Sequence, residues 1–174
     1  RFDLANSLSG HFEDSAGFFQ RVAVAVAQPI AKSDDFPLAV GQRLEHLVDL
    51  LAEADCISDC DTIKNAVWDR ELQRTTGIGE GLAIPHGRCD VLENMVMAMG
   101  RPAAPIDFAS PDKRPVELII LLVSPTNNTS DHIQALGRIS RLMIDRSFRE
   151  AAYSTQDAEE LFTLFHDELQ ASSV

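Results

Sequence analysis

Basic residues are scarce in this sequence, and their scarcity argues against several classes of partner. The chain of 174 residues has 15 Lys and Arg against 27 Asp and Glu, which gives a formal net charge of −12. A chain this acidic is repelled by phosphate backbones and by anionic membrane surfaces, so neither nucleic acid nor lipid is expected as a partner. A basic protein surface is the partner that this charge favours.

Long apolar runs are absent and cysteines are few. No stretch approaches the roughly 20 apolar residues that a membrane-spanning helix needs, and residues 1–6 lack the charged-then-apolar layout of a signal peptide. The three cysteines, an odd number, fit reduced thiols better than a disulfide framework. We therefore expect a cytoplasmic protein without membrane insertion. Its hydrophobic content of 45% is enough for one globular domain with a core.

Hydrophobic periodicity predicts strands that alternate with helices. Strands are expected at residues 22–26, 82–84, 95–99 and 116–123, and the last is apolar on both faces and therefore central in a sheet. Helices are expected at residues 40–53, 58–72, 130–143, 147–152 and 156–169. Asp59 is among the N-cap candidates of the second helix, and Ser130 or Asp131 is the expected N-cap of the third. This alternation predicts an α/β layered fold.

The N-terminal residues differ in composition from the rest of the chain. Residues 1–17 mix Ser, Gly and acidic residues without a convincing period, so we expect them to form an N-terminal tail or linker. The domain is then expected to cover residues 18–174.

The strongest candidate for a functional site lies in residues 70–88, RELQRTTGIGEGLAIPHGR. This stretch presents one histidine, His86, between Pro85 and Gly87. Pro85 fixes its own φ angle, and Gly87 frees the backbone to turn just beyond the histidine. We therefore expect His86 on a stiff loop that a scaffold presents.

Residues 76–87, TGIGEGLAIPHG, resemble the active-site signature of the fructose/mannitol-type enzyme IIA domain (EIIA type 2) of the bacterial phosphoenolpyruvate-dependent sugar phosphotransferase system. Nitrogen-regulatory IIA proteins belong to the same class. Further features agree in order: Arg70-Glu71 before the turn, PIDF and PVEL at 105–108 and 115–118, and Asp131-His132-Ile133 opening a helix. The resemblance covers residues 40–170. It implies a mixed β-sheet flanked by α-helices on both faces, as in the related cytoplasmic domain of anion exchangers.

The resemblance also implies an activity and its residues. His86 would accept a phosphoryl group on Nε2 from the carrier protein HPr, then pass it to a IIB domain or use it as a regulatory signal. Arg70 and His132 would lie beside the phosphohistidine. The chemistry agrees, because a neutral imidazole is a competent nucleophile and a guanidinium suits phosphate geometry. No metal or organic cofactor is expected.

Other residues of the same stretch are expected to support the loop or to offer backbone N–H groups to phosphate. They are Thr76, Gly77, Gly79, Gly81 and Gly87. Glu80 and Asp90 add negative charge, which would repel a phosphoryl group unless both side chains point away from it.

Two alternatives remain open at this point. Cys56, Cys60, His86 and Cys89 form two pairs that superficially resemble a structural zinc site. The chain could also be a regulatory or binding module that keeps the fold without transferring phosphoryl groups. Of the remaining histidines, His46 is interpreted as a partly exposed helix residue, and His11 and His166 as surface residues.

Overall fold

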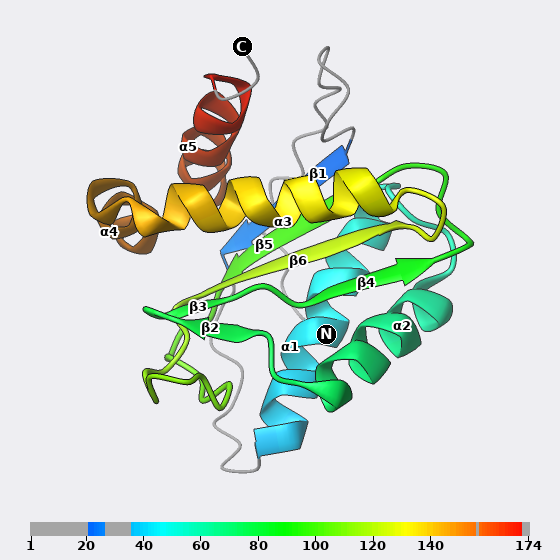
Figure 1. Ribbon diagram of the computed structural model, residues 1–174, viewed down its shortest axis with the longest axis horizontal. Coiled ribbons are helices and arrows are strands. Elements are labelled where there is room, and N and C mark those ends of the chain that lie inside the picture. The colour runs from blue at the N-terminus through cyan, green and yellow to red at the C-terminus, as the bar shows by residue number, and fades with distance from the viewer. Residues whose placement is uncertain (1–20, 27–35, 156, 172–174) are drawn as a thin grey trace.

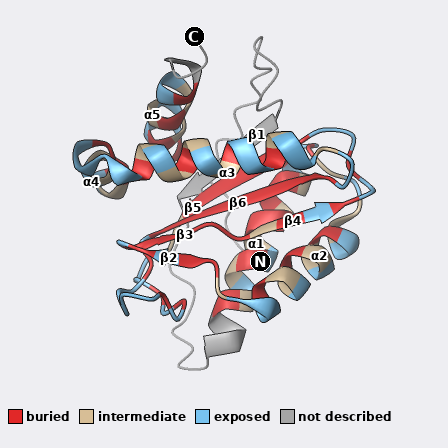
Figure 2. Ribbon diagram, viewed as in Figure 1, coloured by how far each residue is buried: buried red, intermediate tan, exposed pale blue. Residues whose placement is uncertain are grey.

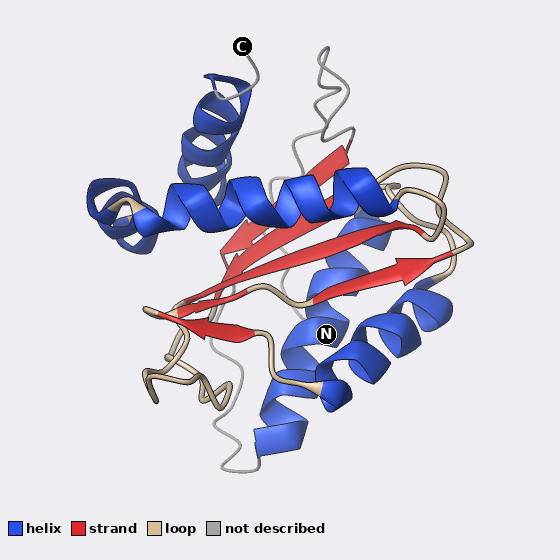
Figure 3. Cartoon of the chain, in the orientation of Figure 1, coloured by secondary structure: helices blue, strands red, loops and turns tan. Residues whose placement is uncertain are grey.

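The computed structural model describes residues 21–26, 36–155 and 157–171, and they form the expected α/β architecture (Figures 1 and 3). The tail predicted at residues 1–17 lies outside this part of the chain. The strands are β1 (Arg21–Val26), β2 (Gly77–Gly79), β3 (Leu82–Ala83), β4 (His86–Cys89), β5 (Val96–Arg101) and β6 (Leu118–Pro125). The helices are α1 (Phe36–Glu53), α2 (Cys60–Gln73), α3 (Thr129–Ile144), α4 (Arg146–Ser154) and α5 (Ala158–Ala171).

The six strands form one mixed sheet around β6. Along the sheet the order is β1-β5-β6-β3-β2, and β4 also pairs with β6. β6 is antiparallel to β5 on one edge and parallel to β3 and β4 on the other. All eight residues of β6 are buried, which confirms the prediction that this strand is central.

β3 and β4 act as one strand that is interrupted at residues 84–85. Leu82 pairs with Leu118 and His86 pairs with Leu122, at the same offset along β6. Proline cannot donate a ladder hydrogen bond, so the regular pairing breaks at Pro85. The Pro85 carbonyl still accepts a hydrogen bond from the Leu122 N–H at 2.9 Å, and this bond keeps the two halves in register.

Helices cover both faces of the sheet, as predicted (Figure 2). Alternate residues of β6 point to opposite faces, so the strand contributes to two buried clusters. Ile119, Leu121 and Val123 pack with buried residues of α1 and α2. The neighbouring leucines and isoleucine of β6 pack instead with buried residues of α3, α4 and α5. Burial on both faces is why this strand is a nearly continuous apolar run.

The structure tests the N-cap predictions for two helices, α2 and α3. The Asp59 carboxylate accepts a hydrogen bond from the Thr62 N–H at 3.0 Å, so Asp59 is the N-cap of α2. The prediction for α3 was wrong by two residues, because its N-cap is Asn128 rather than Ser130 or Asp131. The Asn128 N–H donates to the Pro125 carbonyl at 3.2 Å, and this tight turn starts the helix earlier.

The glycine-rich segment forms a hairpin that the periodicity did not predict. β2 and β3 pair in antiparallel fashion across a turn in which Gly79, Glu80 and Gly81 have φ angles of 101°, 54° and 82°. These are left-handed conformations, which glycine adopts at low cost and which characterise tight hairpin turns. The spacing of the glycines therefore allows the chain to reverse direction between β2 and β3.

Substitution of Gly87 tests how closely β4 packs on α2. A Cβ atom at Gly87 would lie 3.2–3.3 Å from Val67 Cγ2, Val67 N and the Ala66 carbonyl carbon, and two of these neighbours are helix backbone. We expect Gly87→Ala to lower the free energy of unfolding by about 1–3 kcal/mol, measured by urea denaturation. The matched control is Gly137→Ala on α3, where the new Cβ meets no atom within 4 Å. That variant should gain up to about 1 kcal/mol through helix propensity. Equal effects of the two substitutions would contradict the packing argument.

Candidate functional site

His86 is the first residue of β4 and is partly buried. The prediction that it lies on a loop was wrong, because parallel pairing with β6 continues through residues 86–89. The expectation that Gly87 turns the chain was also wrong. Gly87 is a buried strand residue outside the left-handed region, and its missing side chain allows the close contact with α2.

The His86 ring is oriented by its own strand. Nδ1 lies 2.8 Å from the Ile84 carbonyl oxygen. A carbonyl oxygen can only accept a hydrogen bond, so Nδ1 carries the proton in this arrangement. In the neutral ring, Nε2 then holds the free lone pair. The geometry thus leaves Nε2 as the nucleophilic atom.

His132, in the first turn of α3, faces the sheet and is 6% exposed. Its Nδ1 lies 2.8 Å from the hydroxyl oxygen of Ser124, a fully buried residue of β6. The His86 and His132 ring centroids are 5.5 Å apart, with planes at 58°. The structure therefore brings together two histidines that are far apart in the sequence.

Both imidazoles are kept neutral by their surroundings. Burial lowers the pKa of His86 from its usual value, and the nearby charge of Arg70 lowers it further. The hydrogen bond to the Ile84 carbonyl and the charge of Glu71 act in the opposite direction. Burial lowers the pKa of His132 to about 4, with smaller contributions from His86 and Arg88. At neutral pH both rings are therefore uncharged, which suits a nitrogen nucleophile and a hydrogen-bonding neighbour.

The end of α2 supports the histidine strand through Glu71 and Thr76. The buried Glu71 carboxylate accepts hydrogen bonds from the Thr76 N–H at 3.0 Å and from the Thr76 hydroxyl at 2.5 Å. The Thr76 carbonyl in turn accepts from the Ile84 N–H at 3.0 Å. Since Ile84 also accepts the His86 hydrogen bond, this chain of contacts connects α2 to the nucleophile. Neighbouring Arg70 donates to the Arg74 carbonyl at 3.0 Å.

Ser124 and Arg88 are site residues that the sequence analysis missed. Arg88, on β4, donates from Nη1 to the Thr129 hydroxyl at 2.8 Å. Thr129 begins α3, and the first N–H groups of a helix have no partner within the helix. A weak signal was available, because Arg88 ends the motif stretch and Ser124 lies eight residues before His132.

The glycines of the β2–β3 hairpin have neighbours other than the two histidines. A Cβ at Gly77 would collide with the Ser110 hydroxyl oxygen, and one at Gly79 would meet the Asp112 carboxylate at 3.1 Å. At Gly81 the nearest atoms belong to Tyr153, at 3.3 Å. Their contacts are with the 108–112 segment and α4, and the expected loop-support role of these glycines stays a prediction.

The two acidic residues of the motif stretch are engaged away from the histidines. The Glu80 carboxylate forms ion pairs with Arg114 at 2.6 Å and with Arg149 at 3.5 Å. The Asp90 carboxylate accepts a hydrogen bond from the Thr126 hydroxyl. Neither charge contributes to the shifted pKa values of the two histidines. The repulsion considered in the sequence analysis is thus avoided.

The alternative zinc site is not assembled. In the part of the chain that the structure describes, no three His, Cys, Asp or Glu side chains are grouped so that they could hold a metal ion. Cys56, Cys60 and Cys89 form no disulfide within the described residues, in agreement with the prediction of reduced cysteines. They belong to the apolar cluster beneath α1 and α2, and burial raises the pKa of Cys89. His46 and His166 are partly exposed, in agreement with the interpretation of each.

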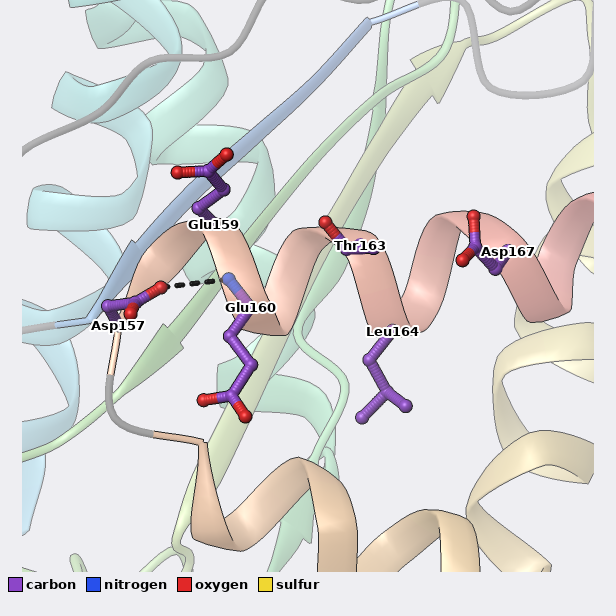
Figure 4. A pocket seen from close by; sticks show the side chains of 6 residues that line it. All are labelled: Asp157, Glu159, Glu160, Thr163, Leu164 and Asp167. Atoms are coloured by element: carbon purple, nitrogen blue, oxygen red, sulfur yellow. Dashed lines mark hydrogen bonds between the residues drawn. The ribbon is translucent and has the colours of Figure 1, made fainter.

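A separate hollow of about 510 Å³ lies along α5 (Figure 4). Its lining is Asp157, Glu159, Glu160, Thr163, Leu164 and Asp167. Four acidic side chains would repel an anionic group, so this hollow is not a second candidate for phosphate chemistry.

Among the helices within the described ranges, none combines the length and apolar character needed to cross a membrane.

Comparison with known sequences gives consistent results. The profile of the family "Phosphoenolpyruvate-dependent sugar phosphotransferase system, EIIA 2" matches residues 40–168. A nitrogen regulatory protein of Bradyrhizobium diazoefficiens is 35% identical over 131 residues, which cover 73% of this chain and 84% of that protein. A fructose-specific EIIA component of Haloferax volcanii is 35% identical over 107 residues, which cover 62% of this chain and 70% of that protein.

Comparison with solved structures supports the same fold. The nitrogen regulatory protein IIA-Ntr of Neisseria meningitidis superimposes with a TM-score of 0.70 at 27% identity, covering 81% of this chain and 91% of that one. Enzyme IIA mannitol of Escherichia coli, in its complex with phosphorylated enzyme IIB mannitol, has a TM-score of 0.66 at 16% identity and covers 88% of this chain and 96% of that one. The second likeness concerns the fold alone.

Histidine titration by NMR tests the electrostatics of the site. We expect His132 to titrate with a pKa of about 4 and His86 to titrate below its usual 6.5. Arg70→Gln should raise the pKa of His86, because removing a nearby positive charge stabilises the imidazolium form. The matched control is Arg146→Gln, since Arg146 is exposed on α4 and paired with Glu150. A His132 midpoint at or above 6.5 would show that the ring is not buried as described.

Proposed function

This chain belongs to the EIIA type 2 family of the phosphoenolpyruvate-dependent sugar phosphotransferase system, and from that premise we propose that His86 is its phosphoryl carrier. The observation that carries the proposal is the hydrogen bond from His86 Nδ1 to the Ile84 carbonyl at 2.8 Å. It fixes the proton on Nδ1 and leaves the Nε2 lone pair free to attack phosphorus.

The transfer step needs no proton movement at His86. The Nε2 lone pair forms the new N–P bond, while the electrons of the breaking P–N bond return to the imidazole of the donor. Nδ1 keeps its proton, and the Ile84 carbonyl meets the positive charge that develops on the phosphorylated ring. Both oxygens of the nearby Glu71 carboxylate are engaged by Thr76, so this group is not free to activate water. That arrangement suits a carrier, whose phosphoryl group must survive until the acceptor arrives.

Arg70 and His132 are proposed to stabilise the phosphoryl oxygens. Arg70 lies close enough to His86 for its charge to lower the pKa of that ring, and a guanidinium matches phosphate geometry. The Ser124 hydroxyl, by donating to His132 Nδ1, would leave an N–H on His132 Nε2 that can donate to the phosphoryl group. The α3 N-terminus beside His132 favours the same negative charge.

The partners follow from the family. Phospho-HPr is the proposed donor, and a IIB domain is the proposed acceptor, supported by the complex of the E. coli mannitol IIA and IIB enzymes. Exchange with such carriers implies a cytoplasmic location and requires no organic cofactor or metal. The chain's net charge of −12 favours donors and acceptors with basic docking surfaces.

A regulatory role is the second candidate. The Bradyrhizobium relative, of which this chain covers 84%, and the Neisseria structure are both named as nitrogen regulatory proteins. Phosphorylation adds about 1.5–2 negative charges, enough to change which proteins bind the surface around His86. Transfer of label from the phosphorylated chain to a IIB domain favours transport, whereas state-dependent binding of another protein without transfer favours regulation.

Phosphorylation by a reconstituted donor system tests the carrier role. The wild type incubated with enzyme I, HPr and labelled phosphoenolpyruvate should form an acid-labile, base-stable adduct. His86→Gln should take up no label, because the nucleophile is lost, while His166→Gln on α5 serves as the matched control and should label normally. A wild type that stays unlabelled with a cognate HPr, or a His86→Gln variant that labels, would refute the proposal.

Ser124→Ala tests the orientation of His132. Loss of the hydroxyl frees the His132 ring, and a hydrogen bond of about 1 kcal/mol corresponds to a fall of roughly fivefold in the initial labelling rate. Ser110→Ala is the control, since Ser110 is equally buried and its hydroxyl has no hydrogen-bond partner in the described structure. The ¹⁵N shifts of His132 should report a changed tautomer in Ser124→Ala only. Equal rates in the two variants would exclude this role for Ser124.

A further inference from the structure

Arg88 is a cation near His132, two residues along β4 from His86, that the transfer step described above does not use. Its side chain donates from Nη1 to the Thr129 hydroxyl at 2.8 Å, across 41 residues of sequence. Its charge also contributes to the lowered pKa of His132, so the guanidinium lies near the second histidine. Arg88 is exposed, and a group in solution can therefore reach it.

The strand register places Arg88 on the same side as the nucleophile. His86 pairs with Leu122 and Arg88 pairs with Ser124, and residues two apart on a strand share a face about 7 Å apart. An extended arginine side chain spans that distance. Because His86 Nδ1 is occupied by the Ile84 carbonyl, Nε2 is the ring nitrogen left for a group that Arg88 could also contact.

The contact that holds Arg88 is weak compared with what a phosphoryl group would offer. A threonine hydroxyl is a neutral acceptor, whereas a phosphoryl group has charged oxygens that a guanidinium can bind in bidentate fashion. Within the described ranges Arg88 forms no ion pair, in contrast to Arg114, Arg146 and Arg149. Arg88 can therefore exchange Thr129 for a stronger acceptor without breaking a salt bridge.

We propose that Arg88 is a second cation of the phosphoryl site and that its partner depends on the phosphorylation state of His86. In the unphosphorylated protein it binds the Thr129 hydroxyl, and after phosphorylation it binds the phosphoryl oxygens on Nε2. The inference rests on the proposed phosphorylation of His86. Its consequence is that phosphorylation removes an exposed arginine from the surface and releases the first residue of α3, a change that a partner protein can recognise.

A ³¹P NMR titration of the phosphorylated full chain tests this exchange. The protein is phosphorylated with potassium phosphoramidate, which needs no partner protein, and the His86 signal is assigned by its absence in His86→Gln. We expect Arg88→Gln to raise the proton affinity of the phosphoryl dianion threefold to fivefold, on the order expected for loss of an exposed charged pair. Arg88→Lys should restore part of the effect, and Arg146→Gln, with the same change in net charge, should titrate like the wild type.

Thr129→Val separates exchange from a purely structural contact. This variant removes the competing acceptor while it leaves Arg88 in place, so the proton affinity of the phosphoryl group should fall slightly or stay the same. If Arg88→Gln titrates like the wild type, or if both variants shift in the same direction, the proposal is overturned. A His86 that takes up no phosphoryl group from phosphoramidate overturns it as well. Chemical phosphorylation with the expected Arg88 effect, but no uptake from phospho-HPr, supports Arg88 and refutes the proposed donor.

Discussion

The parallel pairing of residues 82–89 with one edge of β6 is the constraint on which the site depends. It holds both halves of an interrupted strand in one register, with the break at Pro85. That break leaves the Ile84 carbonyl free of the ladder and available to the His86 ring at 2.8 Å. The sheet thus positions the nucleophile and also selects which ring nitrogen is free. A mobile loop would do neither, because its backbone groups would exchange between water and the ring.

The second requirement is that two imidazoles stay neutral in an acidic protein. An overall charge of −12 would by itself favour protonated histidines, but the short-range environment dominates. Burial lowers the pKa of both histidines. The charge of Arg70 lowers the pKa of His86 further, and the charge of Arg88 lowers that of His132 further. The nearest carboxylate, Glu71, is engaged by Thr76, and Glu80 is paired with arginines on other segments. The charge of Glu71 still acts on His86 in the direction that raises its pKa, and burial outweighs it.

The same geometry serves transport and regulation equally well. Both need a neutral nucleophile, cations that stabilise the adduct and a surface that changes with phosphorylation. The two roles would then differ in the residues that a partner touches, and the exposed Arg88 and the first turn of α3 are candidates for such contacts. Position 88 lies just outside the motif TGIGEGLAIPHG. The residues that select a partner can therefore lie next to the two histidines without taking part in phosphoryl transfer.

Local sequence determined the helices, the central strand and the choice of His86 as the proposed phosphoryl carrier. The apolar run of β6, the stripes of the helices and the Asp59 cap are short-range signals, and residues 76–87 are distinctive enough to identify His86. Tertiary structure alone decided that His86 lies on a strand, because proline and glycine favour a bend until β6 supplies its hydrogen bonds. It alone also brought His132 to His86, and with it the Ser124 hydroxyl bonded to His132 and the first turn of α3 bonded to Arg88, since contacts between distant segments depend on sheet register. The periodicity of a segment carries no information about the strand beside which it will lie.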